Sequence, residues 1–144
     1  MRIVVQRVSE ASVSIDDGIY SSIGRGLLLF VCFESGDSDK TISNAVRKIS
    51  QLRIFEDSTG KMNLNITGIG GEILAVSQFT LSADLAKGNR PSFDTSISKE
   101  EAESLYSRFI DAMSQNLKCQ SGVFGKYMEV NLVNDGPVTF YMEF

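Results

Sequence analysis

Alternating apolar and polar residues are the main pattern in the first part of the chain. Ala11, Val13 and Ile15 alternate with serines, which is the period of a strand with one buried face. Asp16-Asp17-Gly18 follows and predicts a hairpin turn, because Asp-Gly tolerates the positive φ angles of tight turns. We predict strands over residues 2–8, 11–15, 19–23 and 27–33, the last one buried on both faces.

Two other segments repeat apolar residues every three or four positions, which predicts helices with one buried face. The first helix is expected to begin with a cap at Asp37 or Asp39 and to end near Leu52. The second follows the capping-box sequence Ser98-Lys99-Glu100-Glu101 and extends to about Leu117. Their apolar faces consist of Ile42, Ala45, Val46, Ile49 and Leu52, and of Ala102, Leu105, Phe109 and Met113.

The remaining segments complete a pattern of strands and helices in a single domain. Residues 82–97 lack periodicity and form a long loop, which in a compact domain is more often functional than accidental. The order strands, helix, strands, helix, strands predicts one α/β or α+β domain with a mixed sheet over residues 1–144. The further predicted strands are 53–56, 72–78, 128–132 and 138–144, with turns at 57–60 and 134–137.

Composition restricts the chemistry. The 144 residues include no histidine, which excludes Ser-His-Asp and Cys-His catalysis and HExxH zinc sites. The two cysteines, Cys32 and Cys119, form neither a CxxC pair nor a four-cysteine zinc site. Free thiols without a disulfide framework are typical of a reducing compartment. The residues present require no metal and no organic cofactor.

Charge and hydropathy bear on the partners. The net charge is −4, whereas a protein that wraps DNA through many phosphate contacts is usually basic. The apolar run 27–33 is far shorter than the roughly 20 residues of a membrane-spanning helix. We therefore expect a cytoplasmic protein that binds neither DNA nor a membrane.

The sequence Ser77-Gln78-Phe79-Thr80 places two hydroxyls and an amide at the end of an apolar strand. Backbone N–H groups exposed at such a strand end can stabilise an oxyanion. A nucleophilic serine or threonine needs a base, and without histidine only a lysine or a carboxylate remains, which argues against a conventional acyl-enzyme. The alternative is an ordinary turn whose hydroxyls bond to the backbone.

Asn134-Asp135-Gly136-Pro137-Val138-Thr139 is a second candidate segment. Because proline has no N–H, a Gly-Pro bend can leave backbone carbonyls unpaired and convergent. Such carbonyls accept an ammonium group, and they form a rigid wall because neither residue has a movable side chain. The alternative is a plain hairpin turn, since these residue types dominate turns.

The long loop contains a third candidate segment. Lys87 and Arg90 supply two cations and Phe93 supplies an aromatic ring, around a flexible glycine. This combination can hold a phosphate and stack a base, as single-stranded nucleic-acid sites do. The alternative is an exposed polar loop without a ligand.

Together these segments resemble the D-aminoacyl-tRNA deacylase family, which removes D-amino acids from tRNA. The resemblance spans the whole chain, and its most specific parts are residues 77–80 and 134–139, in the family's order. Lys126 departs from the pattern, since a small residue, usually alanine, is expected after Gly125. Other matching segments are 7–8, 11–13, 26–28, 52–55, 60–64, 90–93 and 122–125.

The resemblance implies an α/β fold with two main helices, a mixed sheet rolled into a partial barrel, and a homodimer with active sites at the subunit interface. Gly136 and Pro137, joined by a cis bond, would face the substrate's α-amino group in the partner's pocket. They would exclude an L side chain by steric clash. Glycyl-tRNA, including glycine misattached to alanine tRNA, would be a second substrate because glycine has no side chain to clash.

The resemblance also implies a role for each candidate residue. Ser77 and Gln78 would shape the pocket, Thr80 would position the substrate, and N–H groups near Phe79 and Thr80 would hold the oxyanion. The 2′-hydroxyl of the terminal adenosine would orient or activate the attacking water. The remaining assignments are Lys87, Arg90 and Phe93 at the tRNA 3′ end, and Asn134, Val138 and Thr139 in the chiral-selection segment.

Arg7 would brace that segment by donating to its carbonyls, since a guanidinium has only donors. The alternative for Arg7 is a surface ion pair, a common and weak interaction.

Two competing functions follow from the same residues. A binding module would hold a charged tRNA end through the basic and aromatic loop without hydrolysing it. A small metabolic esterase would use Ser77 or Thr80 as nucleophile with Lys87 as base, and would accept a small ester in place of tRNA.

Overall fold

The alternating residues at the start of the chain form one long strand, β1 (Arg2–Ile15), where two short strands were predicted. In the computed structural model, which describes residues 1–86, 88–93 and 97–144, β1 continues through a tight turn into β2 (Gly18–Ile23). Asp16 and Asp17 both have positive φ, 49° and 63°, which matches the backbone twist that two-residue hairpins prefer. The predicted hairpin is confirmed, although Gly18 already belongs to the second strand.

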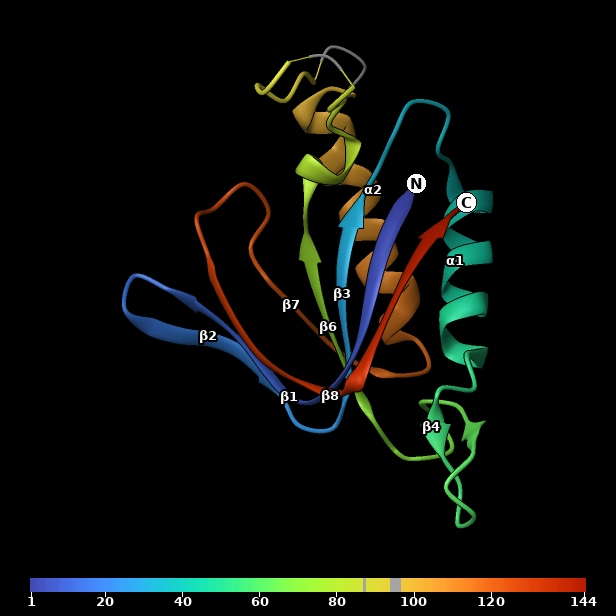
Figure 1. Ribbon diagram of the computed structural model, residues 1–144. Coiled ribbons are helices and arrows are strands. Elements are labelled where there is room, and N and C mark those ends of the chain that lie inside the picture. Colours follow the sequence, from blue (N-terminus) through green and yellow to red (C-terminus); the bar gives the residue numbers. More distant parts are fainter. Residues whose placement is uncertain (87, 94–96) are drawn as a thin grey trace.

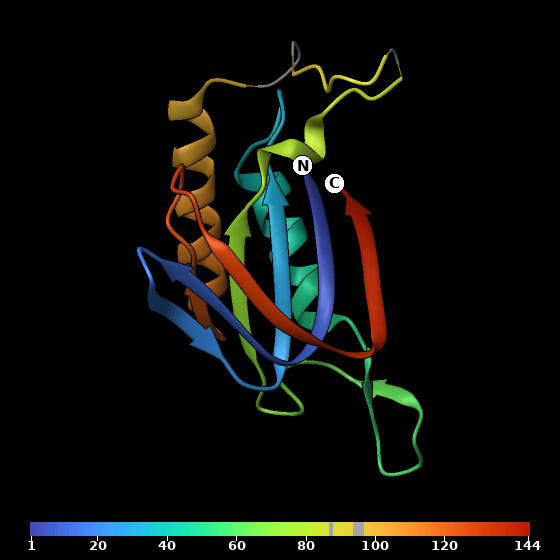
Figure 2. The ribbon, with the colours of Figure 1, turned by 60° about the vertical axis from the view of Figure 1, so that its left-hand side comes forward.

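Six strands form one mixed sheet around β1 (Figures 1 and 2). The order is β2-β1-β3-β6-β7, and β8 pairs antiparallel with β1 along most of its length. The pairs β3–β6 and β6–β7 are parallel. The remaining strands of this sheet are β3 (Gly26–Cys32), β6 (Glu72–Ser77), β7 (Lys118–Ser121) and β8 (Glu129–Glu143).

Two short strands, β4 (Phe55–Glu56) and β5 (Met62–Leu64), form a separate hairpin beyond the end of α1. Figure 1 shows this hairpin projecting below the main sheet. The sequence predicted β4 from residue 53 onward and missed β5, which has only three residues and an exposed Met62.

Helices α1 (Asp39–Gln51) and α2 (Lys99–Ser114) pack on one face of the sheet. Ser98 caps α2 as predicted, because its Oγ accepts the N–H of Glu101 at 3.2 Å, but the helix ends before Leu117. The cap of α1 is Ser38 rather than either aspartate. Asp37 instead accepts hydrogen bonds from the amino group of Met1, at 3.0 Å, and from the N–H of Glu34, at 2.7 Å.

The apolar residues form two clusters, one on each face of the sheet. The larger cluster lies between the sheet and the helices, and the predicted helix positions Ile42, Ala45, Ile49, Leu105, Phe109 and Met113 are all buried in it. The smaller cluster lies where β1, β2 and β8 curl over β3 and β6 (Figure 2). The curl closes much of the sheet on itself, in agreement with the predicted partial barrel. No helix among the described residues is long and apolar enough to span a membrane.

The predicted turn at residues 134–137 is wrong, because the chain does not reverse there. β8 pairs with the same strand, β1, on both sides of this segment. Asn134 pairs with Val8 and Thr139 with Gln6, so four residues of β8 lie opposite Arg7 alone. The extra residues bulge out of the ladder, and a bulge of this kind bends a strand without ending it.

Candidate functional site

Strand β6 ends at Ser77, and the chain then turns through a short 3₁₀ helix, η1 (Phe79–Ser82). Gln78 makes the last ladder bond, its N–H donating to the Val31 carbonyl at 2.8 Å, and its side chain donates to Thr80 Oγ1. Ser77 and Gln78 are half-buried, whereas Phe79 and Thr80 are exposed. The strand therefore ends by presenting an exposed turn of backbone.

The first two amides of this turn have no hydrogen-bond partner among the described residues. In the part of the chain that the structure describes, the N–H groups of Phe79 and Thr80 donate no hydrogen bond, whereas the following ones, of Leu81 and Ala83, bond back to Gln78 and Thr80. The first N–H groups of any helix lack partners within it. Two adjacent free donors at an exposed turn are what an oxyanion site requires.

Three side chains contact the carbonyl groups of this turn, two of them from other strands and one, Ser82, from the turn itself. Arg2 donates to the Leu81 carbonyl at 2.8 Å, and Ser82 Oγ donates to the Phe79 carbonyl at 2.8 Å. Cys32 Sγ lies 3.6 Å from the same Phe79 carbonyl oxygen. Burial raises the pKa of the Cys32 thiol, so it stays protonated and does not act as a nucleophile. None of these three was predicted to act in the site, although Arg2 is a charged residue at the start of an apolar strand.

The bulge of β8 is held by the side chain of Asn134. Its Oδ1 accepts the N–H of Val138 at 2.8 Å, and its Nδ2 donates to Thr139 Oγ1 at 3.1 Å. The Gly136–Pro137 bond is cis, and both residues are exposed, while the Val138 side chain is buried. Gly136 has φ +144°, a value that residues with side chains rarely adopt. The segment thus presents a fixed backbone corner to the surface.

Arg7 lies directly beneath this corner. Its Nε donates to the Asp135 carbonyl at 2.8 Å and lies 3.4 Å from the Asp135 carboxylate, while its Nη1 donates to the Ile54 carbonyl at 2.6 Å. The side chain is only 5% exposed. The alternative of a weak surface ion pair is wrong, because Arg7 is buried and bonds to two backbone carbonyls. The bracing role predicted for it fits these contacts.

The two candidate segments do not meet within one chain. The turn at η1 is tied to Arg2, and the bulge is tied to Arg7, five residues further along β1. At about 3.3 Å per residue, the anchoring points are roughly 16 Å apart along the strand. Figure 1 agrees, since η1 follows the upper end of β6 whereas β8 bends at the lower end of the sheet.

Among the described residues, Phe93 connects the third candidate segment to the first. The Phe93 ring lies against the Phe79 ring, with centroids 5.2 Å apart and planes inclined by 53°. Asp84 and Ser92 exchange backbone bonds of 2.9 and 3.1 Å, which hold the base of this loop. Arg90 is exposed, and Lys87 lies outside the described residues.

A cavity of about 580 Å³ opens beside the end of β6. Ser77, Gln78 and Phe79 form one side of it, the first turn of α2 forms another, and the connection between β7 and β8 forms a third. This volume lies within the range of ordinary small-ligand sites. Beneath it, Tyr106 donates to the Ala75 carbonyl at 2.8 Å, and burial raises the pKa of its phenol above the usual range, so it stays neutral.

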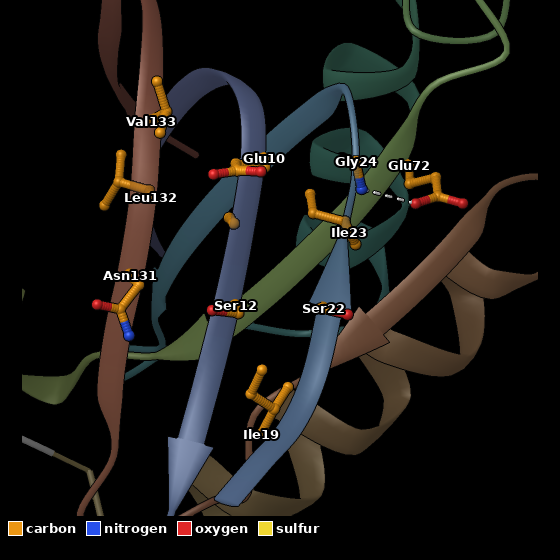
Figure 3. Close-up of a pocket in the computed structure, with 11 residues that line it drawn as sticks. Glu10, Ser12, Ile19, Ser22, Ile23, Gly24, Glu72, Asn131, Leu132 and Val133 are labelled. Atoms are coloured by element: carbon orange, nitrogen blue, oxygen red, sulfur yellow. Dashed lines mark hydrogen bonds between the residues drawn. The ribbon is translucent and has the colours of Figure 1, made fainter.

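A second hollow, of about 610 Å³, lies on the curled face formed by β1, β2 and β8 (Figure 3). Figure 3 shows the polar residues Glu10, Ser12, Ser22 and Asn131 among apolar ones in its lining. The Gly24 N–H donates to Glu72 at 3.0 Å, drawn as a dashed line. None of the described residues predicted for the site lines this hollow. The candidate site is therefore the cavity beside η1 and not this one.

Comparison with known proteins gives one consistent family. The family model described as D-Tyr-tRNA(Tyr) deacylase matches residues 4–143. A D-aminoacyl-tRNA deacylase of Geobacter sulfurreducens is 47% identical over 144 residues, covering 99% of this chain and 95% of the relative. A D-aminoacyl-tRNA deacylase of Thermodesulfovibrio yellowstonii is 48% identical over 140 residues, covering 96% of each chain.

Two solved structures share the fold. The c-Myc DNA Unwinding Element Binding Protein superposes with a TM-score of 0.94 at 40% identity, over 99% of this chain and 98% of that one. A probable eukaryotic D-amino acid tRNA deacylase superposes with a TM-score of 0.87 at 19% identity, over 98% and 97% of the two chains. The second likeness supports the fold alone.

Proposed function

The chain belongs to the D-aminoacyl-tRNA deacylase family and is a hydrolase of aminoacyl-tRNA, and we propose that it works by water attack at the free amides of η1. Water adds to the ester carbonyl carbon, and the bond from that carbon to the ribose oxygen breaks. The amino acid leaves as a free acid, and the ribose oxygen takes up a proton. No covalent intermediate with the enzyme is formed.

The observation that carries this proposal is the pair of unpaired N–H groups of Phe79 and Thr80. Hydrogen bonds from Arg2 and Ser82 hold the backbone that carries these N–H groups. The N–H groups therefore need little rearrangement when negative charge develops on the carbonyl oxygen of the substrate ester. Thr80 Oγ1 already accepts a hydrogen bond from Gln78, and among the described residues it donates none to a carboxylate or a lysine. We therefore assign Thr80 to positioning and the nucleophile to water, oriented or activated by the 2′-hydroxyl of the terminal adenosine.

We further propose that each active site is completed by a second copy of the chain. Gly136 and Pro137 are exposed and rigidly held, yet they lie far along β1 from the η1 turn of their own chain. In a symmetric dimer the same two patches meet twice, once in each site. The exposed corner of one copy would then enter the cavity beside Ser77, Gln78 and Phe79 of the other.

This corner is proposed to select the D-enantiomer. Its backbone carbonyls would accept the substrate's ammonium group, and its wall would leave room only for hydrogen where an L-amino acid carries its side chain. Glycine has only hydrogen where a D- or an L-amino acid carries its side chain, so the wall does not exclude it. Glycyl-tRNA, including glycine misattached to alanine tRNA, is therefore a further proposed substrate.

The first test compares hydrolysis of D-tyrosyl-, L-tyrosyl- and glycyl-tRNA at catalytic enzyme concentration. We expect rapid loss of the D- and glycyl-esters and persistence of the L-ester. Equal rates for the D- and L-esters would remove the chiral wall from the proposal. If all three esters persist while the charged tRNA is retained, the chain is a binding module.

A second test separates water attack from an acyl-enzyme. We expect Thr80→Ala to keep substantial activity, and we expect a severe loss when the terminal ribose lacks its 2′-hydroxyl. A Thr80→Ala protein that binds substrate but hydrolyses none would favour the alternative in which Thr80 is the nucleophile.

The negative net charge is compatible with a tRNA substrate that is gripped only at its end. Few phosphate contacts are then needed, and we assign them to Arg90 and Lys87 with Phe93 as a stacking partner. The name of one structural relative refers to DNA binding. A net charge of −4 does not favour the extensive phosphate contacts of a duplex binder, so we propose no DNA partner for this chain.

A further inference from the structure

The cavity beside η1 carries positive charge that the hydrolytic mechanism does not use. Two lysines line it, Lys99 from the first residue of α2 and Lys126 from the connection between β7 and β8. No aspartate or glutamate is among the described residues that line it. In a chain of net charge −4, a cavity lined by two cations and no described acid is an unequal distribution that calls for an anionic ligand.

The two sides of the cavity that carry these lysines meet at Gly125. A Cβ atom built on Gly125 would lie 3.3 Å from Cε and 3.4 Å from Nζ of Lys99. The ammonium group of Lys99 therefore lies close to the residue that directly precedes Lys126. Gly125 has φ +71°, a left-handed conformation that favours glycine, and its missing side chain leaves the space that Lys99 occupies.

Neither lysine has an acidic partner. Among the described residues, ion pairs engage Arg2, Arg7, Arg108 and Lys118, but not Lys99 or Lys126. Neither side chain donates a hydrogen bond within the described part of the chain. Lys99 also begins a helix, where the helix dipole disfavours a cation. An anion bound between the two ammonium groups would compensate both the unpaired charges and the dipole.

We infer that Lys99 and Lys126 bind the phosphate that links the last two nucleotides of the substrate tRNA. The inference rests on the proposed function, which places the ester at the amides of Phe79 and Thr80, and Phe79 lines the same cavity as the two lysines. The ribose of the terminal nucleoside carries the ester, and a single phosphate on its 5′ side links it to the preceding nucleotide. A doubly contacted phosphate would fix the register of the acceptor end, so that the ester and not a neighbouring ribose lies at the amides.

The test uses three D-tyrosyl esters that differ only in phosphate content. The ester of adenosine has no phosphate, the ester of the dinucleotide CpA has the one phosphate in question, and D-tyrosyl-tRNA has all of them. For the unaltered protein we expect kcat/KM to be about tenfold higher for the CpA ester than for the adenosine ester, mainly through KM. The neutral tyrosyl side chain removes any contribution from an acidic amino acid.

The double variant Lys99→Met/Lys126→Met removes both charges and keeps the aliphatic length. We expect it to lose the advantage of the CpA ester and to hydrolyse the adenosine ester at the original rate. Lys99→Arg/Lys126→Arg should retain most of that advantage, because it keeps the charge. Lys48→Met, a change of an exposed lysine near the end of α1 that does not line the cavity, is the matched control and should change nothing.

The outcomes are distinguishable. If the double variant keeps the full preference for CpA over adenosine, the phosphate role is overturned. If it hydrolyses the adenosine ester as poorly as the CpA ester, the lysines support the cavity wall and do not bind phosphate. If the unaltered protein hydrolyses none of the three esters, the proposed function itself fails, whatever the lysines do.

Discussion

Within the segment 77–80, the atoms available for catalysis belong to the backbone. Phe79 offers its amide at the first position of η1, where the absence of an acceptor leaves the N–H free. Proline is tolerated at the first position of a helix, because its fixed φ suits the helix and the lost N–H had no partner. A substitution there can therefore delete one hydrogen-bond donor and leave the fold in place.

We accordingly predict that Phe79→Pro lowers kcat for D-tyrosyl-tRNA by about 10²- to 10³-fold, the usual cost of one oxyanion donor. Phe79→Ala is the matched control, because it removes the ring and its contact with Phe93 but keeps the N–H. It should affect KM more than kcat. Single-turnover kinetics of both variants measure the difference, and equal losses of kcat would argue against an oxyanion role for this amide.

Gly136 is the residue at which a side chain is least tolerated in the bulge. A Cβ atom would lie 2.6 Å from Val138 Cγ2, 2.9 Å from the Val138 nitrogen and 3.2 Å from Arg7 Nη2. We predict that Gly136→Ala abolishes most activity and lowers stability by about 1–3 kcal/mol, because the corner must shift. Hydrolysis assays and thermal unfolding measure the two effects.

Gly70→Ala provides the control for backbone strain alone. Gly70 also has positive φ, +62°, but nothing lies within 4 Å of its built Cβ. This variant should lose about 1 kcal/mol of stability while keeping its activity and D-selectivity. Normal rate and selectivity in Gly136→Ala would contradict the role assigned to the corner.

At the scale of elements, the β4–β5 hairpin owes its turn to one carboxylate. Asp57 accepts hydrogen bonds from the side chain and the N–H of Thr59, at 2.6 and 2.8 Å, and from the side chain of Asn63, at 3.0 Å. These bonds, with the Thr59 hydroxyl as the largest cause, lower the pKa of Asp57 from 3.8 to about 2. The ionised carboxylate is thus favoured in the folded state.

A carboxyl group whose pKa is lower in the folded state than in the unfolded state stabilises the fold at pH values above its unfolded pKa. This stabilisation disappears as the pH falls through the folded pKa. We predict that the Tm difference between the unaltered protein and Asp57→Asn is largest above pH 3.8 and vanishes near pH 2. Thermal unfolding at a series of pH values measures this. A difference that stays constant down to pH 2 would show that the charge of Asp57 plays no part.

The elements that the sequence predicted well are those with a strong period of their own. The helix faces and the buried strand β3 are explained by apolar spacing alone. β7 was missed because its sequence, KCQS, is short and has no β-branched residue, and only its parallel pairing with β6 makes it a strand. The 134–137 segment has turn residues, yet long-range pairing with β1 on both sides overrides that local preference.

At the scale of the whole molecule, the sequence named the residues of the candidate segments but could not show how far apart the fold places them. Residue types and motif order carry no information on distance, whereas the register of β1 separates Arg2 and its contact at η1 from Arg7 and the bulge. This separation turns the proposed dimer into a testable requirement: the η1 turn and the Gly136–Pro137 corner of one site must come from different chains.

Mixing two inactive variants tests that requirement. Phe79→Pro damages the turn but keeps the corner, and Gly136→Ala damages the corner but keeps the turn. In a mixed dimer, one site combines both damaged parts and the other combines both intact parts. After unfolding and refolding of an equal mixture, half of the dimers are mixed, so we predict about a quarter of the original activity. If each site were built from a single chain, every site would contain one damaged part, and mixing would restore nothing.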